Sequence, residues 1–164
     1  MKIILLILIV FIASCNHKID NLNLKFEDYK FDSKKSYIIL KSNLDLNSLL
    51  YTNKKESLIN NYLICPLLGT FSSTKIEDMP YIIRGHDSSR TLNPIYKIKD
   101  TFYYQYEIEF CKLNRNDIIL NDTLKNLLKK RDSLPCRLIL VQNILTTTNT
   151  TIFNIPTDLL LKRL

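Results

Sequence analysis

The stretch Thr101-Phe-Tyr-Tyr-Gln-Tyr-Glu-Ile-Glu-Phe-Cys111 decides the fold, because apolar and mostly polar side chains alternate along it. With the two-residue period of a strand, one face consists of Phe102, Tyr104, Tyr106, Ile108 and Phe110. The other face consists of Tyr103, Gln105, Glu107, Glu109 and Cys111. One buried face and one wet face are typical of an antiparallel sheet. Lys99-Asp100 predicts a turn that joins this strand to Tyr96-Lys-Ile98 in a hairpin.

Shorter apolar runs on both sides of this hairpin predict further strands. These runs are Leu22 to Phe26, Ser36 to Lys41, Tyr81 to Arg84, Arg137 to Val141 and Thr150 to Phe153. The interleaved aromatic and basic residues of Tyr96 to Tyr104 suit the core of a strand, although such a pattern can also stack bases or sugars.

Three segments predict helices. Asn53 and Glu56 have capping-box spacing before a helix over 54–64. Asn121 or Asp122 begins a second helix that turns Leu124, Leu127 and Leu128 inward and that Pro135 ends. A short last helix runs from Asp158 to Arg163. We therefore expect an α+β domain with a mostly antiparallel sheet, two main helices and a short C-terminal helix.

The first fifteen residues read as a secretion signal. Lys2 precedes the uncharged stretch Ile3 to Ala13, which is too short for a transmembrane helix of about 20 residues. Ile12-Ala13-Ser14-Cys15 resembles the lipobox of bacterial lipoproteins. This resemblance implies that residues 1–14 are removed and that Cys15 is acylated, which anchors the chain in a membrane. We expect residues 15–22 to form a lipidated tether and 23–164 a single α+β domain.

The same resemblance places the chain in a Gram-negative cell envelope. Asn16 is not the aspartate that holds enteric lipoproteins at the inner membrane, so the outer membrane is favoured. The net charge of +7 falls to +6 when Lys2 is lost with the signal. At this location a basic excess suits anionic lipid or an acidic protein partner, and we expect no nucleic-acid partner.

An odd number of cysteines remains once Cys15 is acylated. Cys65, Cys111 and Cys136 then allow one disulfide and one free thiol in an oxidising compartment. Three pairings are possible, and Cys111 with Cys136 is favoured among them because both residues flank the second helix. The alternative is three buried thiols without a bridge.

No catalytic set is assembled in the sequence. The candidates are His86, in the polar segment Gly85 to Arg90 that we expect to be an exposed turn, and Glu107 with Glu109, which share a strand face about 7 Å apart. No spacing indicates a metal site, and we expect no cofactor. The sequence thus favours a non-enzymatic, lipid-anchored interaction module, such as an assembly factor, a binding subunit or an immunity-type inhibitor. The alternative is an envelope hydrolase that uses His86 with a thiol or with the Glu107 and Glu109 face.

Replacement of Cys15 tests the lipid anchor. We expect Cys15→Ala to move the protein from the membrane fraction to the soluble fraction, because the acyl chains supply the membrane affinity. Fractionation of cells, with circular dichroism of the released protein to show that it is folded, measures this. A Cys15→Ala protein that stays with the membrane contradicts the lipoprotein interpretation.

Overall fold

The computed structural model describes residues 17–18, 22–32, 35–51, 60–71, 79–89, 92–112, 119, 121–141, 147–162 and 164. The strands are β1 (His17–Lys18), β2 (Leu24–Asp32), β3 (Lys35–Ser42), β4 (Asn60–Pro66), β5 (Tyr81–Asp87), β6 (Tyr96–Ile98), β7 (Thr101–Lys112), β8 (Ser133–Val141), β9 (Thr147–Asn149) and β10 (Phe153–Pro156). The helices are α2 (Leu46–Tyr51), α3 (Asn121–Leu128) and α4 (Thr157–Leu161).

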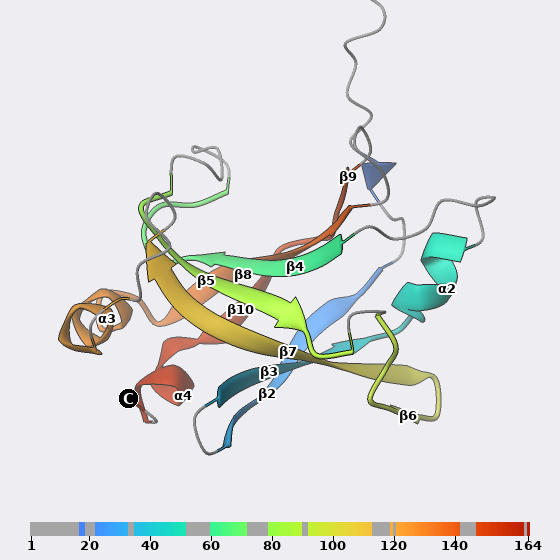
Figure 1. Cartoon of the computed structure of the whole chain (residues 1–164), viewed down its shortest axis with the longest axis horizontal. Coiled ribbons are helices and arrows are strands. Elements are labelled where there is room, and N and C mark those ends of the chain that lie inside the picture. The colour runs from blue at the N-terminus through green and yellow to red at the C-terminus, as the bar shows by residue number, and fades with distance from the viewer. Residues whose placement is uncertain are drawn as a thin grey trace, which may run out of the picture.

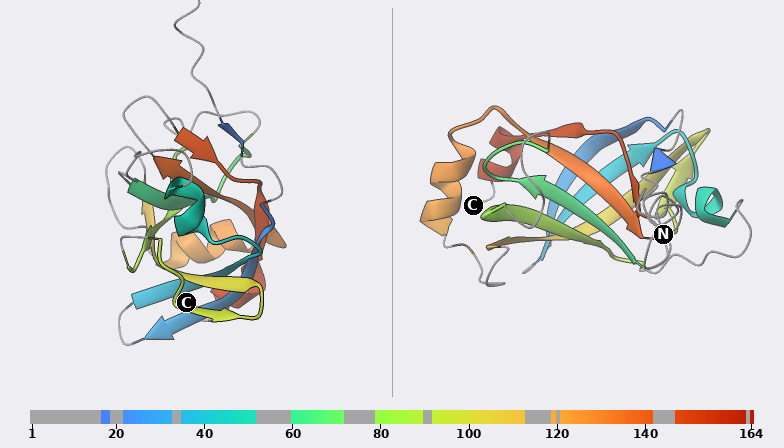
Figure 2. Two further views of the ribbon diagram at one scale, coloured as in Figure 1. Left: turned by 90° about the vertical axis from the view of Figure 1, so that its right-hand side faces the viewer. Right: turned by 90° about the horizontal axis from the view of Figure 1, so that it is seen from above.

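The strands form one mostly antiparallel sheet that curls into a nearly closed barrel (Figure 1). Its order is β1-β9-β8-β4-β5-β7-β3-β2, with β6 added to β7 and β10 added to β8. Among the strands that the structure describes, the short β1–β9 pair is the only parallel one. Strand β10 lies against β2 without a ladder between them, so this seam is where the barrel stays open (Figure 2). The expected mostly antiparallel sheet is confirmed.

The inner face of β7 lies in the core, as its alternation predicts. Tyr104 and Tyr106 are fully buried, and Ile108 is nearly so. Helix α3 buries Leu124, Leu127 and Leu128 against the same core, which confirms the inward face expected for that helix. Helices α3 and α4 lie together at one end of the barrel, and α2 lies at the other (Figure 1).

The predicted helix over 54–64 is wrong for its second half, because residues 60–64 belong to β4; residues 52–59 lie outside the described residues. Strand β4 is central, with β5 on one edge and β8 on the other. Leu63, Ile64 and Cys65 are buried on both sheet faces, and such a continuous apolar run has no strand period to recognise. Of the two expected main helices, α3 is present in the described residues, and α2 is a short helix that the sequence pattern did not indicate.

Two residues expected to interrupt structure lie inside strands. Pro135 does not end a helix; it lies in β8 opposite Asn154, where β8 has β10 but not yet β4 beside it, so its missing N–H is tolerated. Gly85 is not in an exposed turn but is buried in β5. A Cβ atom there would come within 3.0 Å of Leu63 Cβ and 3.2 Å of Ile108 Cγ2. Glycine at this position permits the close approach of the neighbouring strands.

The segment expected to be a tether is partly structured. Leu22 is buried in the core, so the folded domain begins before residue 23. His17 and Lys18 pair with Thr148 and Asn149 of β9. Backbone pairing at a sheet edge does not require apolar side chains, so the polar residues His17 and Lys18 gave no pattern from which this short strand could be predicted.

The disulfide joins Cys65 to Cys136, and Cys111 is free and buried. The expected Cys111–Cys136 pair is therefore wrong. That prediction assumed that the two cysteines on either side of α3 lie next to each other in the fold. The bridge instead follows from the β4–β8 register: one position beyond the Ile64–Arg137 pair, Cys65 faces Cys136, with 4.2 Å between their Cα atoms.

Removing the bridge tests this pairing. It closes a separation of 71 residues, so Cys65→Ala with Cys136→Ala should lower the free energy of unfolding by about 4 kcal/mol through loop-closure entropy. Cys111→Ala leaves the bridge intact and serves as the control. Urea unfolding measures the stabilities, and alkylation with peptide mapping identifies the free thiol. Recovery of Cys111 in a bridged peptide contradicts the assignment.

Candidate functional site

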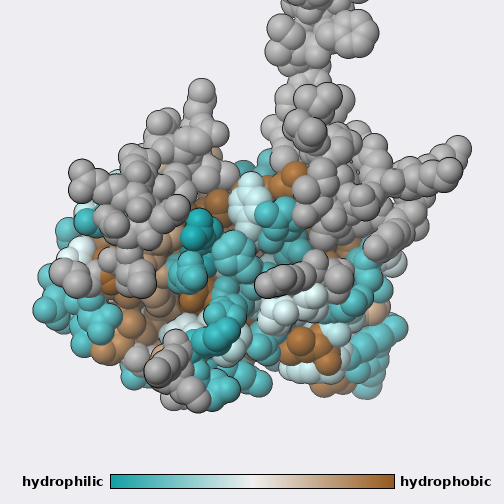
Figure 3. Space-filling view, in the orientation of Figure 1, coloured by the Kyte–Doolittle hydropathy of each residue, from teal (hydrophilic) through white to brown (hydrophobic). Residues whose placement is uncertain are grey.

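A cleft of about 680 Å³ opens in the barrel wall where β4 and β5 separate. Their pairing ends at Tyr62 and His86; beyond that point Asn61 pairs with β8, and Asp87 pairs with β7. The cleft is lined by Lys35, Asn60, Asn61, His86, Asp87, Ser88, Glu107 and Glu109. Polar side chains dominate the central part of the face on view in Figure 3. The cleft is thus a product of strand divergence rather than of a loop.

The three candidate residues of the sequence analysis, His86, Glu107 and Glu109, all line this cleft. His86 is opposite Glu107 in the β5–β7 register, and Arg84 is opposite Glu109. The three therefore lie on one outer face of two adjacent strands. His86 reaches this position from a strand and not from the exposed turn that its polar neighbours predict.

Both carboxylates carry a cationic partner. Lys35 Nζ lies 2.9 Å from Glu107 Oε2, and Arg84 Nη2 lies 3.3 Å from Glu109 Oε2. The hydrogen bond to Glu107 and its charge raise the pKa of Lys35 above its ordinary value. A pair of carboxylates that works as acid and base needs environments that push their pKa values apart. Here each carboxylate is instead held by its own cation.

The inner part of the cleft contains buried polar groups. Asp87 accepts hydrogen bonds from the Ser89 N–H at 3.0 Å, the Ser89 hydroxyl at 2.7 Å and the Leu92 N–H at 2.6 Å. Asn61 is only 4% exposed, and its Oδ1 has no hydrogen-bond partner among the described residues. An acceptor so placed is costly to leave unpaired. Among the residues that line this cleft, Asn61 is the one whose side chain most directly indicates that a hydrogen-bond donor from another molecule could be accommodated.

Tyr106 adds a second buried polar group close to this region. It pairs with Asp87 across the β5–β7 ladder, and its hydroxyl also has no partner within the described part of the chain. Burial, and to a smaller extent the charge of Asp87, raises the pKa of Tyr106 well above its ordinary value. The hydroxyl therefore stays protonated, as a donor on the inner side of the barrel wall.

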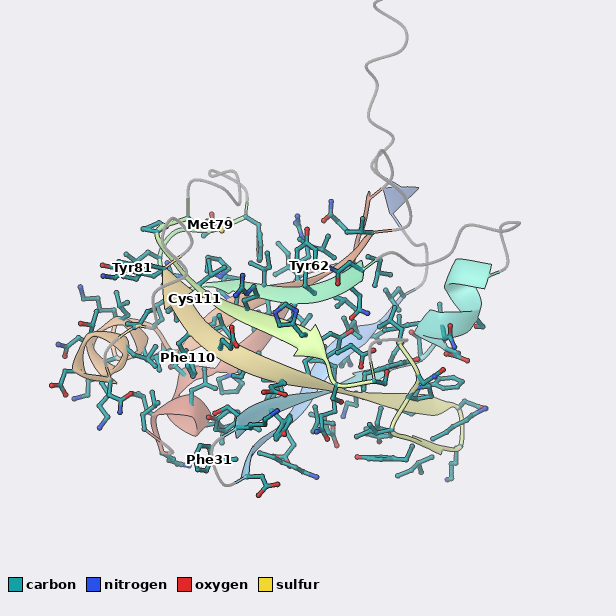
Figure 4. All side chains as sticks on the ribbon, in the orientation of Figure 1. Phe31, Tyr62, Met79, Tyr81, Phe110 and Cys111 are labelled. Carbon is teal, nitrogen blue, oxygen red and sulfur yellow. A yellow bond between two sulfur atoms is a disulfide. The ribbon has the colours of Figure 1, made fainter. Side chains whose placement is uncertain are left out.

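No thiol comes near His86 in the described residues. Cys65 and Cys136 are bridged, and Cys111 lies four positions along β7 from Glu107, or about 13 Å at the strand rise. Figure 4 shows Cys111 toward the end of the sheet that carries Met79 and Tyr81, whereas Tyr62, the partner of His86, lies farther along β4. Burial raises the pKa of the Cys111 thiol. The arrangement does not form a thiol–histidine pair.

Within the described ranges, no group of three or more His, Cys, Asp or Glu side chains is arranged to hold a metal ion. No helix in the same ranges is long and apolar enough to cross a membrane.

Sequence reasoning missed Lys35, Asn61 and Asp87 as members of this site. Asn61 lay in a segment with helical spacing, and Asp87 lay in a segment with turn composition. Lys35 comes from β3, on the far side of β7 from β5, and its 2.9 Å contact joins residues 72 positions apart. No local pattern connects such residues, because only the sheet order brings them together.

The environment of Cys111 predicts low reactivity. Since burial disfavours the thiolate, Cys111 should react with iodoacetamide far more slowly in the folded protein than in denaturant at the same neutral pH. Mass spectrometry over time measures the rate. Fast alkylation of the folded protein contradicts the structural role of this thiol.

Comparison of the chain with protein-family models, with curated proteins and with solved structures finds no match.

Proposed function

We propose that this chain is a lipid-anchored, non-enzymatic binding domain of the Gram-negative envelope, which holds a protein partner through the cleft between β4 and β5. The observation that supports this most is that Asn61, whose buried Oδ1 has no hydrogen-bond partner among the described residues, is one of the residues that line a cleft of about 680 Å³. Leaving a buried acceptor unpaired costs about 1–3 kcal/mol, which a donor from a partner recovers on binding.

The charges of the cleft indicate which donor fits. Asp87, Glu107 and Glu109 contribute three carboxylates to the lining, against the cations of Lys35 in the lining and of Arg84 beside Glu109, which leaves one negative charge in excess. An ammonium or guanidinium group donates several hydrogen bonds and carries the complementary charge. A lysine or arginine side chain of the partner is therefore the group that we place in the cleft, with Asn61 Oδ1 as its innermost acceptor.

Binding accounts for the ion pairs better than hydrolysis does. The Lys35–Glu107 and Arg84–Glu109 pairs position the carboxylates but leave neither as an unpaired base. The rival hydrolase rests on the convergence of His86, Glu107 and Glu109 in one cleft. It predicts that an envelope hydrolytic activity is lost on replacement of each of these residues, and three fully active variants dispose of it.

The lipid anchor keeps the proposed binding domain at the membrane. Acylation of Cys15 holds the domain at the membrane, and an assembly factor, a binding subunit and an immunity-type inhibitor all need a partner-binding surface there. The outer membrane remains the favoured location, on the basis of Asn16.

Two matched charge reversals test the cleft. Glu107 and Glu27 each form an ion pair with a lysine, Lys35 and Lys41, and the side chains of both glutamates are 35% exposed. Only Glu107 lines the cleft. Glu107→Lys should reduce partner capture by about tenfold or more, because it places a like charge beside the partner's cation, whereas Glu27→Lys should not.

In vivo cross-linking, followed by quantitative mass spectrometry of the captured proteins, measures the effect. The comparison runs between the unaltered protein, Glu107→Lys, Glu27→Lys and an unrelated lipoprotein. No protein enriched over the unrelated lipoprotein contradicts a binding role. Equal loss in both variants contradicts the cleft as the binding site.

A further inference from the structure

The β6–β7 hairpin exposes an unusual amount of apolar surface. Five large hydrophobic side chains are exposed in the described part of the chain, and three of them lie within four consecutive residues. These three are Ile95 at 41%, Tyr96 at 42% and Ile98 at 55% exposure. Exposed apolar residues scattered singly need no explanation, but such a concentration on one hairpin marks an interaction surface.

The hairpin is held in place rather than loosely attached. The N–H of Ile95 donates to the Tyr103 carbonyl at 2.7 Å, and the rings of Tyr96 and Tyr103 stack with 4.4 Å between centroids. On the other side, Lys97 Nζ lies 4.6 Å from the centroid of the Phe102 ring. The aromatic and basic pattern, expected to build strand core, thus builds a rigid exposed tip.

The tip from Ile95 to Asp100 carries two lysines and one aspartate, a net charge of +1, while desolvation and then the nearby charges of Glu27 and Asp28 of β2 raise the pKa of Tyr96. Lys97 and Lys99 are exposed beside the apolar residues, with Asp100 as the only acidic residue between 95 and 100. Apolar and aromatic side chains flanked by lysines are typical of segments that sit at the interface of an anionic bilayer. The chemistry of the hairpin therefore fits a lipid surface.

The position of the hairpin fits the same surface. Strand β1 begins at His17, two residues after Cys15, so the lipidated residue lies within about 7 Å of β1 along the chain. Along the long axis, β1 and β6 lie toward the same end of the barrel, with β1 on the upper side and β6 on the lower side in Figure 1 (Figures 1 and 2). Helices α3 and α4 and the C-terminus lie at the opposite end. The anchor thus brings the hairpin end of the barrel toward the bilayer.

We propose that the hairpin tip, Ile95 to Asp100, contacts the anionic phospholipid surface in which Cys15 is anchored and so fixes the orientation of the barrel on the membrane. This inference rests on the lipid anchor of the proposed function. With the tip on the bilayer, the end that carries α3 and α4 points away from it.

The chain contains no tryptophan, which permits a direct test. In Ile98→Trp the single indole reports on the tip. Phe31→Trp is the matched control, because Phe31 is 49% exposed and lies near the opposite end of the barrel (Figure 4). The full-length lipidated protein is reconstituted into phosphatidylglycerol vesicles whose acyl chains carry bromine, which quenches a nearby indole. We expect strong quenching and a blue shift for Ile98→Trp and neither for Phe31→Trp.

A second comparison tests the role of charge. Adding Lys99→Glu to Ile98→Trp should reduce the quenching, as should replacement of phosphatidylglycerol by neutral phosphatidylcholine. Unchanged quenching in both cases overturns the preference for anionic lipid.

The outcomes separate the two proposals. Protein that floats with the vesicles while Ile98→Trp remains unquenched overturns the hairpin contact and leaves the anchor standing; the tip then belongs to a protein interface. Equal quenching of both tryptophans overturns the proposed orientation. Protein that does not float with the vesicles overturns the anchor and the hairpin contact together.

Discussion

The structure depends on the two-faced alternation of β7. This strand has twelve residues. It pairs with β6 over 101–103, with β3 over 102–108 and with β5 over 106–112. Its row of inward aromatic and aliphatic side chains lies on one face only, and that face must be covered. A sheet that is apolar on one face buries that face by curling on itself, which here produces a nearly closed barrel. Tyr104 at the centre of the inner face shows how the core is completed: its hydroxyl accepts a hydrogen bond from the Leu46 N–H at 2.7 Å, which ties α2 to the barrel.

The same strand places the polar groups of the cleft. Glu107 and Glu109 point outward because their neighbours point inward, and β5 and β3 bring His86, Arg84 and Lys35 to them from the two sides. The cleft opens because β4 follows β8 while β5 follows β7. Farther along β4, the Cys65–Cys136 bridge fixes β4 to β8, and buried Gly85 permits the close packing of β5 against Leu63 and Ile108. Tight strand packing on one side of Tyr62 and strand separation on the other thus place the cleft at a defined position in the wall.

The proposed anchor, cleft and hairpin form a consistent arrangement. A domain held at a bilayer by its first residues gains a defined orientation only if a second surface also meets the lipid, since one flexible attachment leaves rotation free. The tip of the β6–β7 hairpin lies toward the same end of the long axis as β1 and is the second surface that we propose. The cleft is then presented to partners at a fixed height above the membrane, which shortens the search for a partner confined to the same space.

The sequence by itself determined the elements whose evidence is local: the alternating strand Thr101 to Cys111, the hairpin at Lys99-Asp100, the inward leucines of α3, and the mostly antiparallel sheet. It also selected His86, Glu107 and Glu109, although not the reason that they meet. Only the tertiary structure decided that residues 60–64 are a central strand, that Pro135 lies in β8, that Cys65 and not Cys111 bridges Cys136, and that Asn61 and Lys35 belong to the cleft. Periodicity records which side chains an element turns toward a core, but it carries no information on which strands become neighbours. The strand order is determined by the requirement that all apolar faces are buried together, and the positions of the bridge and the cleft both follow from that order.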